Sequence, residues 1–274
     1  MNIEELKKHS INIRRNIIKM VSSAKSGHPG GSLSATDILT VLFFEKMNIN
    51  KENANSNKRD RFVLSKGHAS PVLYATLFEK GIINEDLSTF RQLNSNLQGH
   101  PSMHKLPGID MSTGSLGQGI STAVGMAIAN KLDNNDHKVY ALIGDGESQE
   151  GLVWEALMAA SHFKLNNLCI ILDFNHLQID GEIEKVMNPT PFDEKFRAFG
   201  LNVKIIDGHN YEEISETFDE FINNNLDKPT IIIANTIKGK GVSFMENKYE
   251  WHGSSPNEEE TKLALSELCL KENS

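Results

Sequence analysis

Short apolar runs alternate along this chain with longer segments whose apolar residues recur at a helical period. The short runs predict buried strands at 62–65, 139–143, 168–172, 203–207 and 230–236. The longer segments predict helices at 2–23, 34–47, 69–80, 115–132, 150–163, 191–199, 211–224 and 257–271. This alternation favours an α/β fold in which a central, mostly parallel sheet carries helices on both faces.

Several segments interrupt the alternation. The sequence SGHPGG at 26–31 is too rich in glycine and proline to predict a regular helix. Ser34 with Asp37 resembles a capping box and predicts that the next helix begins there. Residues 48–58 predict an exposed loop, and 84–111 are mixed. We expect one domain over 1–274, with a Gly-rich segment at 238–256 and a short terminal helix.

Composition and charge exclude several classes of protein. The 274 residues carry a formal net charge of −8 and no basic block, which argues against nucleic acid as a partner. No apolar run is long enough to span a membrane, and the start MNIEELKKHS does not resemble a signal peptide, so a cytoplasmic location is expected. Cys169 lies in an apolar run and Cys269 near the C-terminus, without the spacing of a zinc site or disulfide framework.

Polar groups follow two of the predicted strands. Asp145 lies in the sequence GDG directly after the run at 139–143, and Asn175 follows the run at 168–172. Parallel strands that are joined by a helix end at the same sheet edge, so these two side chains can meet where open α/β sheets bind ligands. Carboxylate and amide oxygens suit Mg²⁺ or Ca²⁺, and Mg²⁺ completes its shell with water and phosphates. The pattern predicts a metal-bridged diphosphate site.

Two other interpretations of this turn stay open. Asp and Gly are ordinary turn residues, so GDG alone is compatible with a tight turn without a ligand. A Rossmann-like nucleotide site fits less well, because no G-x-G-x-x-G opens the helix after the strand.

Four histidines share an unusual setting. His28, His68, His100 and His252 each adjoin Gly or Pro in a segment without helical or strand period. Rigid loops are where ligand-facing polar groups concentrate, and imidazole can bind a diphosphate or a sugar hydroxyl and can move protons. The other histidines carry no motif and are expected to be surface or structural residues; they stand at positions 9, 104, 137, 162, 176 and 209.

Eight motifs occur in the order that is typical of one enzyme family. They are AKSGHPGG (24–31), SKGHASP (65–71), QGHP (98–101), STGSLGQG (112–119), GDGESQEG (144–151), DFNHLQIDG (173–181), KGKG (238–241) and WHG (251–253). Together they resemble the N-terminal, diphosphate-binding domain of transketolase over nearly the whole chain. The resemblance implies thiamine diphosphate, Mg²⁺ or Ca²⁺, and transfer of a two-carbon ketol group from a ketose phosphate to an aldose phosphate.

The resemblance also implies roles for the histidines and for one carboxylate. His28 and His252 match residues that flank the reactive carbon, and His252 counts among the cofactor contacts. His68 matches a residue near the diphosphate and thiazolium, and His100 one that contacts donor hydroxyls. Glu150 matches a carboxylate in a proton relay between paired active sites, although a Glu in a first helical turn is also favoured by the helix dipole.

Further cofactor contacts follow from the same resemblance. The metal ligands would be Asp145, Asn175 and the carbonyl oxygen of Leu177. The remaining cofactor residues would be Gly114, Ser115, Leu116, Gly146 and Ile179, although many family members have Pro in place of Ser115. Lys238 and Lys240 could contact phosphates or lie in a solvated loop.

One group that the family needs is missing from these motifs. In the family, a Glu from a pyrimidine-binding domain activates the cofactor, and no motif here supplies it. We therefore expect a split transketolase of the pentose phosphate pathway, in which this N-terminal subunit forms a heterotetramer with a C-terminal subunit. A fragment of a longer chain is the alternative, and the polar end 271–274 favours a natural subunit.

Other activities remain as alternatives. They are deoxyxylulose phosphate synthase, a transketolase for a specialised sugar, a 2-oxo acid dehydrogenase component and a non-catalytic cofactor-binding subunit. The four histidines suit a polyhydroxylated substrate and argue against the dehydrogenase component.

Overall fold

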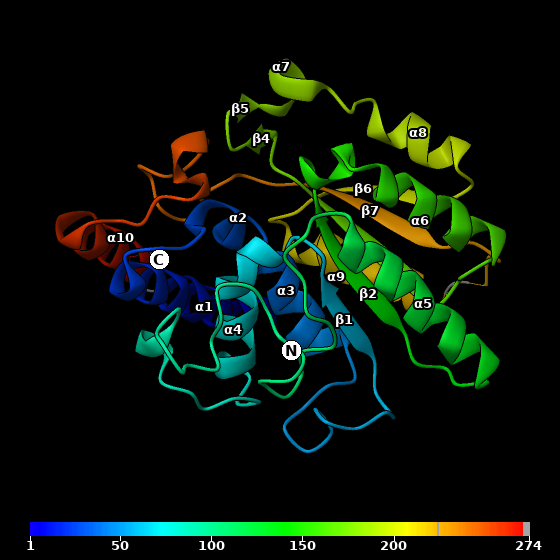
Figure 1. Ribbon diagram of the computed structural model, residues 1–274, viewed down its shortest axis with the longest axis horizontal. Helices are drawn as coiled ribbons and strands as arrows, with labels where there is room; N and C mark the ends of the chain where they lie inside the picture. Colours follow the sequence, from blue (N-terminus) through cyan, green and yellow to red (C-terminus); the bar gives the residue numbers. More distant parts are fainter. Residues whose placement is uncertain (224, 271–274) are drawn as a thin grey trace.

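A five-stranded parallel sheet forms the centre of the molecule in the computed structural model, which describes residues 1–223 and 225–270 (Figure 1). The strand order is β1-β2-β3-β7-β6, and every neighbouring pair is parallel. The strands are β1 (Arg61–Leu64), β2 (Val139–Gly144), β3 (Leu168–Phe174), β6 (Asn202–Asp207) and β7 (Thr230–Asn235). The predicted α/β class and all five predicted strands are confirmed.

Alternate residues of each strand face opposite sides of the sheet and build two separate cores. Leu142 and Ile171 pack into one core, and their neighbours Ile143 and Ile170 into the other. Figure 1 shows the helices on both faces. The first core holds α1 (Ile3–Ala24), α3 (Thr36–Val41), α4 (Ser70–Glu79), α9 (Tyr211–Ile222) and α10 (Glu258–Leu270), and the second α5 (Gln118–Leu132), α6 (Gly151–His162) and α8 (Phe192–Ala198).

The segment after α1 differs from its prediction. A short helix, α2 (Pro29–Ser34), occupies residues that were expected to be irregular. Proline is compatible with a helix at its first turn, and this helix is fully buried, so tertiary packing outweighs the weak helix propensity of its glycines. The predicted capping box at Ser34 is also wrong, because its hydroxyl donates to Asp173 (2.6 Å). A π-helical turn (Leu42–Lys46) follows α3.

Several small elements had no signal in the hydrophobic pattern. The chain after β3 forms a hairpin of β4 (Leu177–Gln178) and β5 (Gly181–Glu182), followed by α7 (Ile183–Met187). The segment 238–256 contains a 3₁₀ turn (Tyr249–His252). Other 3₁₀ turns are Gly67–Ala69, Leu87–Thr89 and Glu147–Gln149.

Most of the remaining predictions hold within a few residues. Helix α5 begins at Gln118 instead of position 115. Cys169 is buried and Cys269 is exposed. The predicted helix ends at 224 and 271, and the polar end 271–274, lie outside the described residues. In the described part of the chain, no helix has the length and apolar character that crossing a membrane requires.

Candidate active site

A pocket of about 320 Å³ lies at the carboxyl ends of β2 and β3. Gly144 at the end of β2 is paired in register with Asp173 on β3, so the turns that follow them lie side by side. The Oδ2 atom of Asp145 accepts a hydrogen bond from the backbone N–H of His176 (2.7 Å). Asn175 Oδ1 accepts from the N–H of Leu177 (3.2 Å). The sheet therefore brings Asp145 and Asn175 together, as the spacing predicts.

Lys66 and Asp173 form a buried ion pair at the base of this pocket. The ammonium of Lys66 donates to Asp173 Oδ2 and to the carbonyl of Gly31 (2.8 Å). Asp173 also accepts from the hydroxyls of Ser34 and Thr236. Burial acts to raise the pKa of Asp173, but Lys66 and the two hydroxyls outweigh burial and hold the pKa below its ordinary value. The ion pair therefore places a carboxylate whose charge is balanced by Lys66 next to the candidate metal ligands.

Asp145 has less compensation than Asp173. It is 3% exposed, and burial raises its pKa to about 6, with a further contribution from the nearby charge of Asp173. The positive charges of Lys238 and Lys66 offset only part of this shift. A buried carboxylate in this state favours any cation that enters the pocket.

Lys238 enters the pocket from the segment after β7. Its side chain is buried, and its ammonium donates to the carbonyl oxygen of Leu177 (2.9 Å) and lies 3.1 Å from His252 Nδ1. A Cβ at Gly30 would lie 3.0 Å from Lys238 Cγ and 2.8 Å from the carbonyl oxygen of Trp251, so glycine leaves room for the lysine to pass. The solvated-loop interpretation of Lys238 is wrong.

Glu147 lines the pocket and joins three segments of the chain. Its carboxylate accepts from the hydroxyl of Ser65 (2.6 Å) and from the backbone N–H groups of Gly117 (2.9 Å) and Gly144 (3.0 Å). These partners come from the ends of β1 and β2 and from the start of α5. Glu147 thus fixes the relative positions of loops that line the pocket.

Three of the four predicted histidines form one cluster. The ring centroid of His28 lies 5.1 Å from that of His68 and 5.4 Å from that of His252, and the last two rings are 5.1 Å apart. His28 Nδ1 is buried and has no hydrogen-bond partner among the described residues. His100 is exposed and packs beside Gly114, where a Cβ would lie 3.0 Å from its ring.

Burial and positive charge keep the clustered imidazoles neutral. Burial lowers the pKa of His28 to about 4, with help from Arg91, and lowers that of His252 to about 3, with help from Lys238. Burial and Lys66 hold the pKa of His68 well below its ordinary value. Because an ammonium donates to His252 Nδ1, the proton of that neutral ring belongs on Nε2, which leaves Nε2–H as a donor.

The other predicted site residues divide into two groups. The pocket is lined by Leu116, Gly146, Glu150, Leu177 and Ile179. Gly114 and Ser115 lie just before Leu116 in a loop outside this lining, with the side chain of Ser115 exposed. Glu150 occupies the N-cap of α6 and makes no side-chain capping bond there.

Three charged residues of the site had no assigned role in the sequence analysis. They are Lys66, Glu147 and Asp173, and each is almost fully buried. One signal was available: Lys66 comes directly after the predicted strand at 62–65, and Asp173 comes directly after the apolar run at 168–172. Charged residues at strand ends of a parallel sheet point to its ligand edge.

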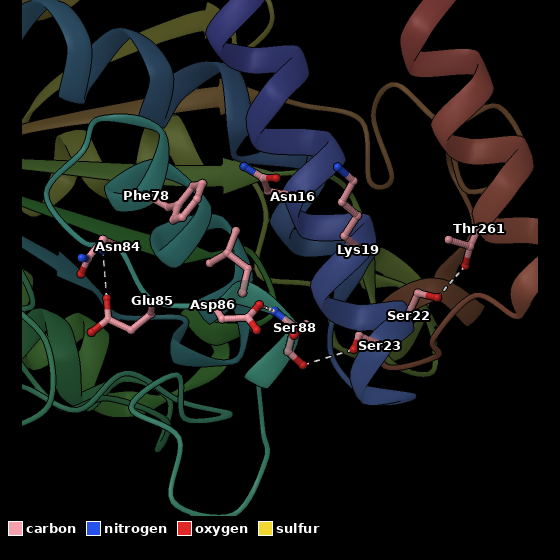
Figure 2. Close-up of a pocket in the computed structure, with 11 residues that line it drawn as sticks. Asn16, Lys19, Ser22, Ser23, Phe78, Asn84, Glu85, Asp86, Ser88 and Thr261 are labelled. Atoms are coloured by element: carbon pink, nitrogen blue, oxygen red, sulfur yellow. Dashed lines mark hydrogen bonds between the residues drawn. The ribbon is translucent and has the colours of Figure 1, made fainter.

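A second, larger hollow of about 800 Å³ lies elsewhere, between α1 and the segment after α4. Figure 2 shows its lining side chains, several of which bond to one another: Asp86 with the N–H of Ser88 (2.9 Å), and Ser22 with Thr261 (2.8 Å). We call this hollow the α1 groove.

Comparison with known proteins agrees with the geometry of the strand-end pocket. Residues 6–274 match the family model described as transketolase, thiamine diphosphate binding domain. The chain belongs to the transketolase family. It is 42% identical to one subunit of an apulose-4-phosphate transketolase from Phocaeicola vulgatus, over 98% of this chain and 95% of that protein. It is 44% identical to the 6-deoxy-6-sulfo-D-fructose transketolase subunit SqwG from Clostridium sp. strain MSTE9, over 95% of both chains.

Solved structures show the same relationship. The structure of transketolase from Campylobacter jejuni superposes with a TM-score of 0.91 at 38% identity, over 98% of this chain. This chain spans 43% of that transketolase. The transketolase fold is therefore shared, and the relatives include both subunit-length proteins and transketolases more than twice as long.

Proposed function

We propose that this chain is the diphosphate-binding subunit of a two-chain transketolase. With a C-terminal subunit it transfers a two-carbon ketol group from a ketose phosphate to an aldose phosphate. The observation that carries the proposal is the convergence of Asp145, Asn175 and the Leu177 carbonyl beside a cluster of neutral histidines. The subunit names of two relatives support the division into chains.

The donor set fits Mg²⁺ or Ca²⁺. Asp145, Asn175 and the Leu177 carbonyl offer the oxygen ligands that these ions prefer, and the remaining positions of a magnesium shell suit water and phosphate. The structure itself places a cation, the Lys238 ammonium, on the Leu177 carbonyl. These three residues would hold the metal.

The neighbouring groups fit a diphosphate. Lys238 and the region around Gly146 would contact its oxygens, with Leu116 and Ile179 against the rings of the cofactor. Thiamine diphosphate supplies the electron sink for carbon–carbon cleavage when it is bound. We propose one diphosphate-binding domain over residues 1–274, with Gly114 and Ser115 completing the cofactor contacts.

The histidines would hold the sugar and move protons at its oxygens. A neutral imidazole can donate a hydrogen bond to a hydroxyl or accept one from it, and the low pKa values of His28 and His252 keep both rings neutral at neutral pH. The Nε2–H of His252 would act as a donor. His100 is exposed, packs beside Gly114 and would contact donor hydroxyls.

The partner would cover the open side of the pocket. Ile179 is 61% exposed at the rim, and Met187 on α7 is 64% exposed. Exposed apolar side chains next to a ligand pocket favour a partner surface. We propose a C-terminal subunit with the activating Glu, two copies of each chain per complex, and Glu150 as a relay group between paired sites. We also propose that the complex acts in the cytoplasm, in the pentose phosphate pathway.

A reconstitution assay tests this function. Ketol transfer from xylulose 5-phosphate to ribose 5-phosphate is measured with Mg²⁺ and thiamine diphosphate, for this chain alone and with the protein encoded beside it. Activity only in the mixture is the expected result. Cofactor binding without turnover in the mixture would contradict a pentose phosphate substrate, and apulose 4-phosphate and 6-deoxy-6-sulfo-D-fructose would then be tried as donors. Activity that survives His28→Ala would contradict the role of the histidine cluster.

A further inference from the structure

A second polar cluster lies outside the lining of the pocket. The carboxylate of Asp37 on α3 accepts hydrogen bonds from Arg14 Nη1 (2.8 Å) and Nη2 (2.7 Å), from His209 Nδ1 (2.8 Å) and from the hydroxyl of Tyr211 (2.6 Å). Ser10 also donates to it. We call these five residues the Asp37 cluster.

The cluster is built as a fixed unit. Asp37 is 3% exposed and Arg14 is 5% exposed. Burial acts to raise the pKa of Asp37, but Arg14 and His209 outweigh it and hold the pKa well below its ordinary range. The bidentate Arg14–Asp37 pair has a defined orientation, and its members come from α1 and α3, whereas His209 and Tyr211 come from the junction of β6 and α9.

Two members of the cluster reach the segment that carries Lys238. His209 Nε2 accepts a hydrogen bond from the backbone N–H of Ile237 (2.9 Å). Arg14 Nε donates to the backbone carbonyl of Lys240 (3.0 Å). These contacts hold the backbone one residue before and two residues after Lys238, whose ammonium lies on the Leu177 carbonyl.

The contacts of His209 define its tautomer. An N–H from Ile237 requires an unprotonated Nε2, so the proton of the ring lies on Nδ1 and is donated to Asp37. The carboxylate therefore orients the imidazole, and the imidazole orients the backbone before Lys238. The same carboxylate orients the guanidinium that holds the backbone after it.

We infer that the Asp37 cluster positions Lys238: Asp37 orients His209 and Arg14, and these two residues fix the backbone on both sides of Lys238 so that its ammonium stays in the pocket. His209 and Arg14 are positioning residues and touch none of the reacting groups. The consequence for cofactor affinity rests on the proposed function, whereas the effect on Lys238 itself does not.

Two substitutions at position 209 separate the contact that His209 makes through Nδ1 from the contact that it makes through Nε2. In His209→Gln the side-chain amide reaches the place of Nε2 and can still accept from Ile237. In His209→Asn the shorter amide keeps the place of Nδ1 beside Asp37 but cannot reach Ile237. Each variant loses one hydrogen bond of the same ring, so a purely structural role predicts similar effects of both.

The first measurements use the chain without cofactor or partner. Hydrogen exchange of the Ile237 amide is expected to accelerate at least tenfold in His209→Asn and clearly less in His209→Gln, which keeps the contact with Ile237 but loses the orienting bond to Asp37. Reductive methylation of Lys238, followed by mass spectrometry, is expected to approach the rate of the exposed Lys51 only in the Asn variant. Equal behaviour of the two variants, or wild-type behaviour of the Asn variant, would overturn the inference.

Two further arms complete the test. If circular dichroism shows that His209→Asn does not fold, Arg14→Lys takes its place, because it keeps a positive charge beside Asp37 and loses the Nε–H that bonds Lys240; faster methylation of Lys238 is again expected, and an unchanged rate would overturn the inference. In the two-chain complex, thiamine diphosphate affinity is expected to fall in step with Lys238 exposure. Exposure of Lys238 without loss of affinity would leave the positioning role standing and would contradict the proposed diphosphate contact.

Discussion

The pocket at the ends of β2 and β3, the strand-end pocket, is smaller than the α1 groove but holds more buried charge. The groove, at about 800 Å³, has more than twice the volume of the pocket, at about 320 Å³. In the groove, Asp86 and Ser88 are exposed, and the carboxylate of Asp86 accepts from the N–H of Ser88, only two residues away (Figure 2). The pocket instead concentrates buried charges that come from distant parts of the sequence, among them Lys66, Asp145 and Lys238.

The comparison indicates that buried charge identifies a ligand site better than the volume of a hollow does. An exposed hydrogen bond in the groove competes with water and has little net effect on a ligand. A buried carboxylate such as Asp145 has lost its hydration, so a metal ion or an ammonium interacts with it strongly. Matched substitutions in the two hollows should therefore differ in their effects.

The largest difference is expected for one carboxylate in each hollow. Asp145→Asn removes the charge of the proposed metal ligand, and ketol transfer by the two-chain complex should fall by on the order of 10³-fold. Asp86→Asn in the groove should leave the rate within a factor of about two of wild type. Steady-state assays at saturating Mg²⁺ and thiamine diphosphate measure both rates. A large loss of activity in Asp86→Asn would indicate that the groove, and not the pocket, is the active site.

A lysine pair compares the stability of the two regions. Lys66→Met leaves Asp173 buried and uncompensated, and it should lower the free energy of unfolding by about 3–5 kcal/mol. Lys19→Met on the exposed rim of the groove should change it by less than about 0.5 kcal/mol. Urea unfolding of the isolated chain measures both. The double variant Lys66→Met, Asp173→Leu should recover part of the loss, and no recovery would contradict the ion-pair explanation.

The pocket should also show a pH response that the groove lacks, because the described residues that line the groove include no histidine. The pKa of His28 is lowered to about 4 from an ordinary value near 6.5, so the unfolded chain binds more protons between these values. The free energy of unfolding should therefore fall as the pH drops from about 6.5 to about 4. NMR titration of the imidazole carbon-bound protons measures the pKa of each histidine directly. Titration of His28 and His252 near pH 6.5 would rule out their neutral, buried state.

The smallest expected contrast comes from two serines. Ser34→Ala removes a buried hydroxyl that donates to Asp173 and should cost about 1.5–3 kcal/mol of unfolding free energy. Ser22→Ala removes a contact with Thr261 at the edge of the groove and should cost about 1 kcal/mol or less. Equal costs in thermal or urea unfolding would show that burial does not separate the two regions.

The parts of the site that could be predicted from the sequence are those that follow strand ends. The spacing of Asp145 and Asn175, with a helix between them, required a parallel βαβ unit, and the structure forms it. The four histidines were singled out by their Gly-rich settings, and three of them share one cluster. Such positions depend on local pattern, which a single sequence carries.

The parts that could not be predicted depend on contacts between distant segments. Helix α2 contains two glycines and forms because the surrounding core buries it, which local propensity cannot show. The pairing of Lys66 with Asp173 joins residues 107 positions apart. For Lys238 the sequence allowed both a phosphate contact and a solvated loop, since only the tertiary structure shows that its side chain is buried.

The most direct test of the account is the position of the metal. Crystals of the complex of this chain with its C-terminal subunit, grown with Mn²⁺ and thiamine diphosphate, allow the metal to be located by anomalous scattering. One anomalous peak is expected about 2.0–2.6 Å from the Asp145 carboxylate, Asn175 Oδ1 and the Leu177 carbonyl oxygen, with the diphosphate beside it. A complex that binds the cofactor without a peak at these three oxygens, or with the cofactor in the α1 groove, would contradict this expectation.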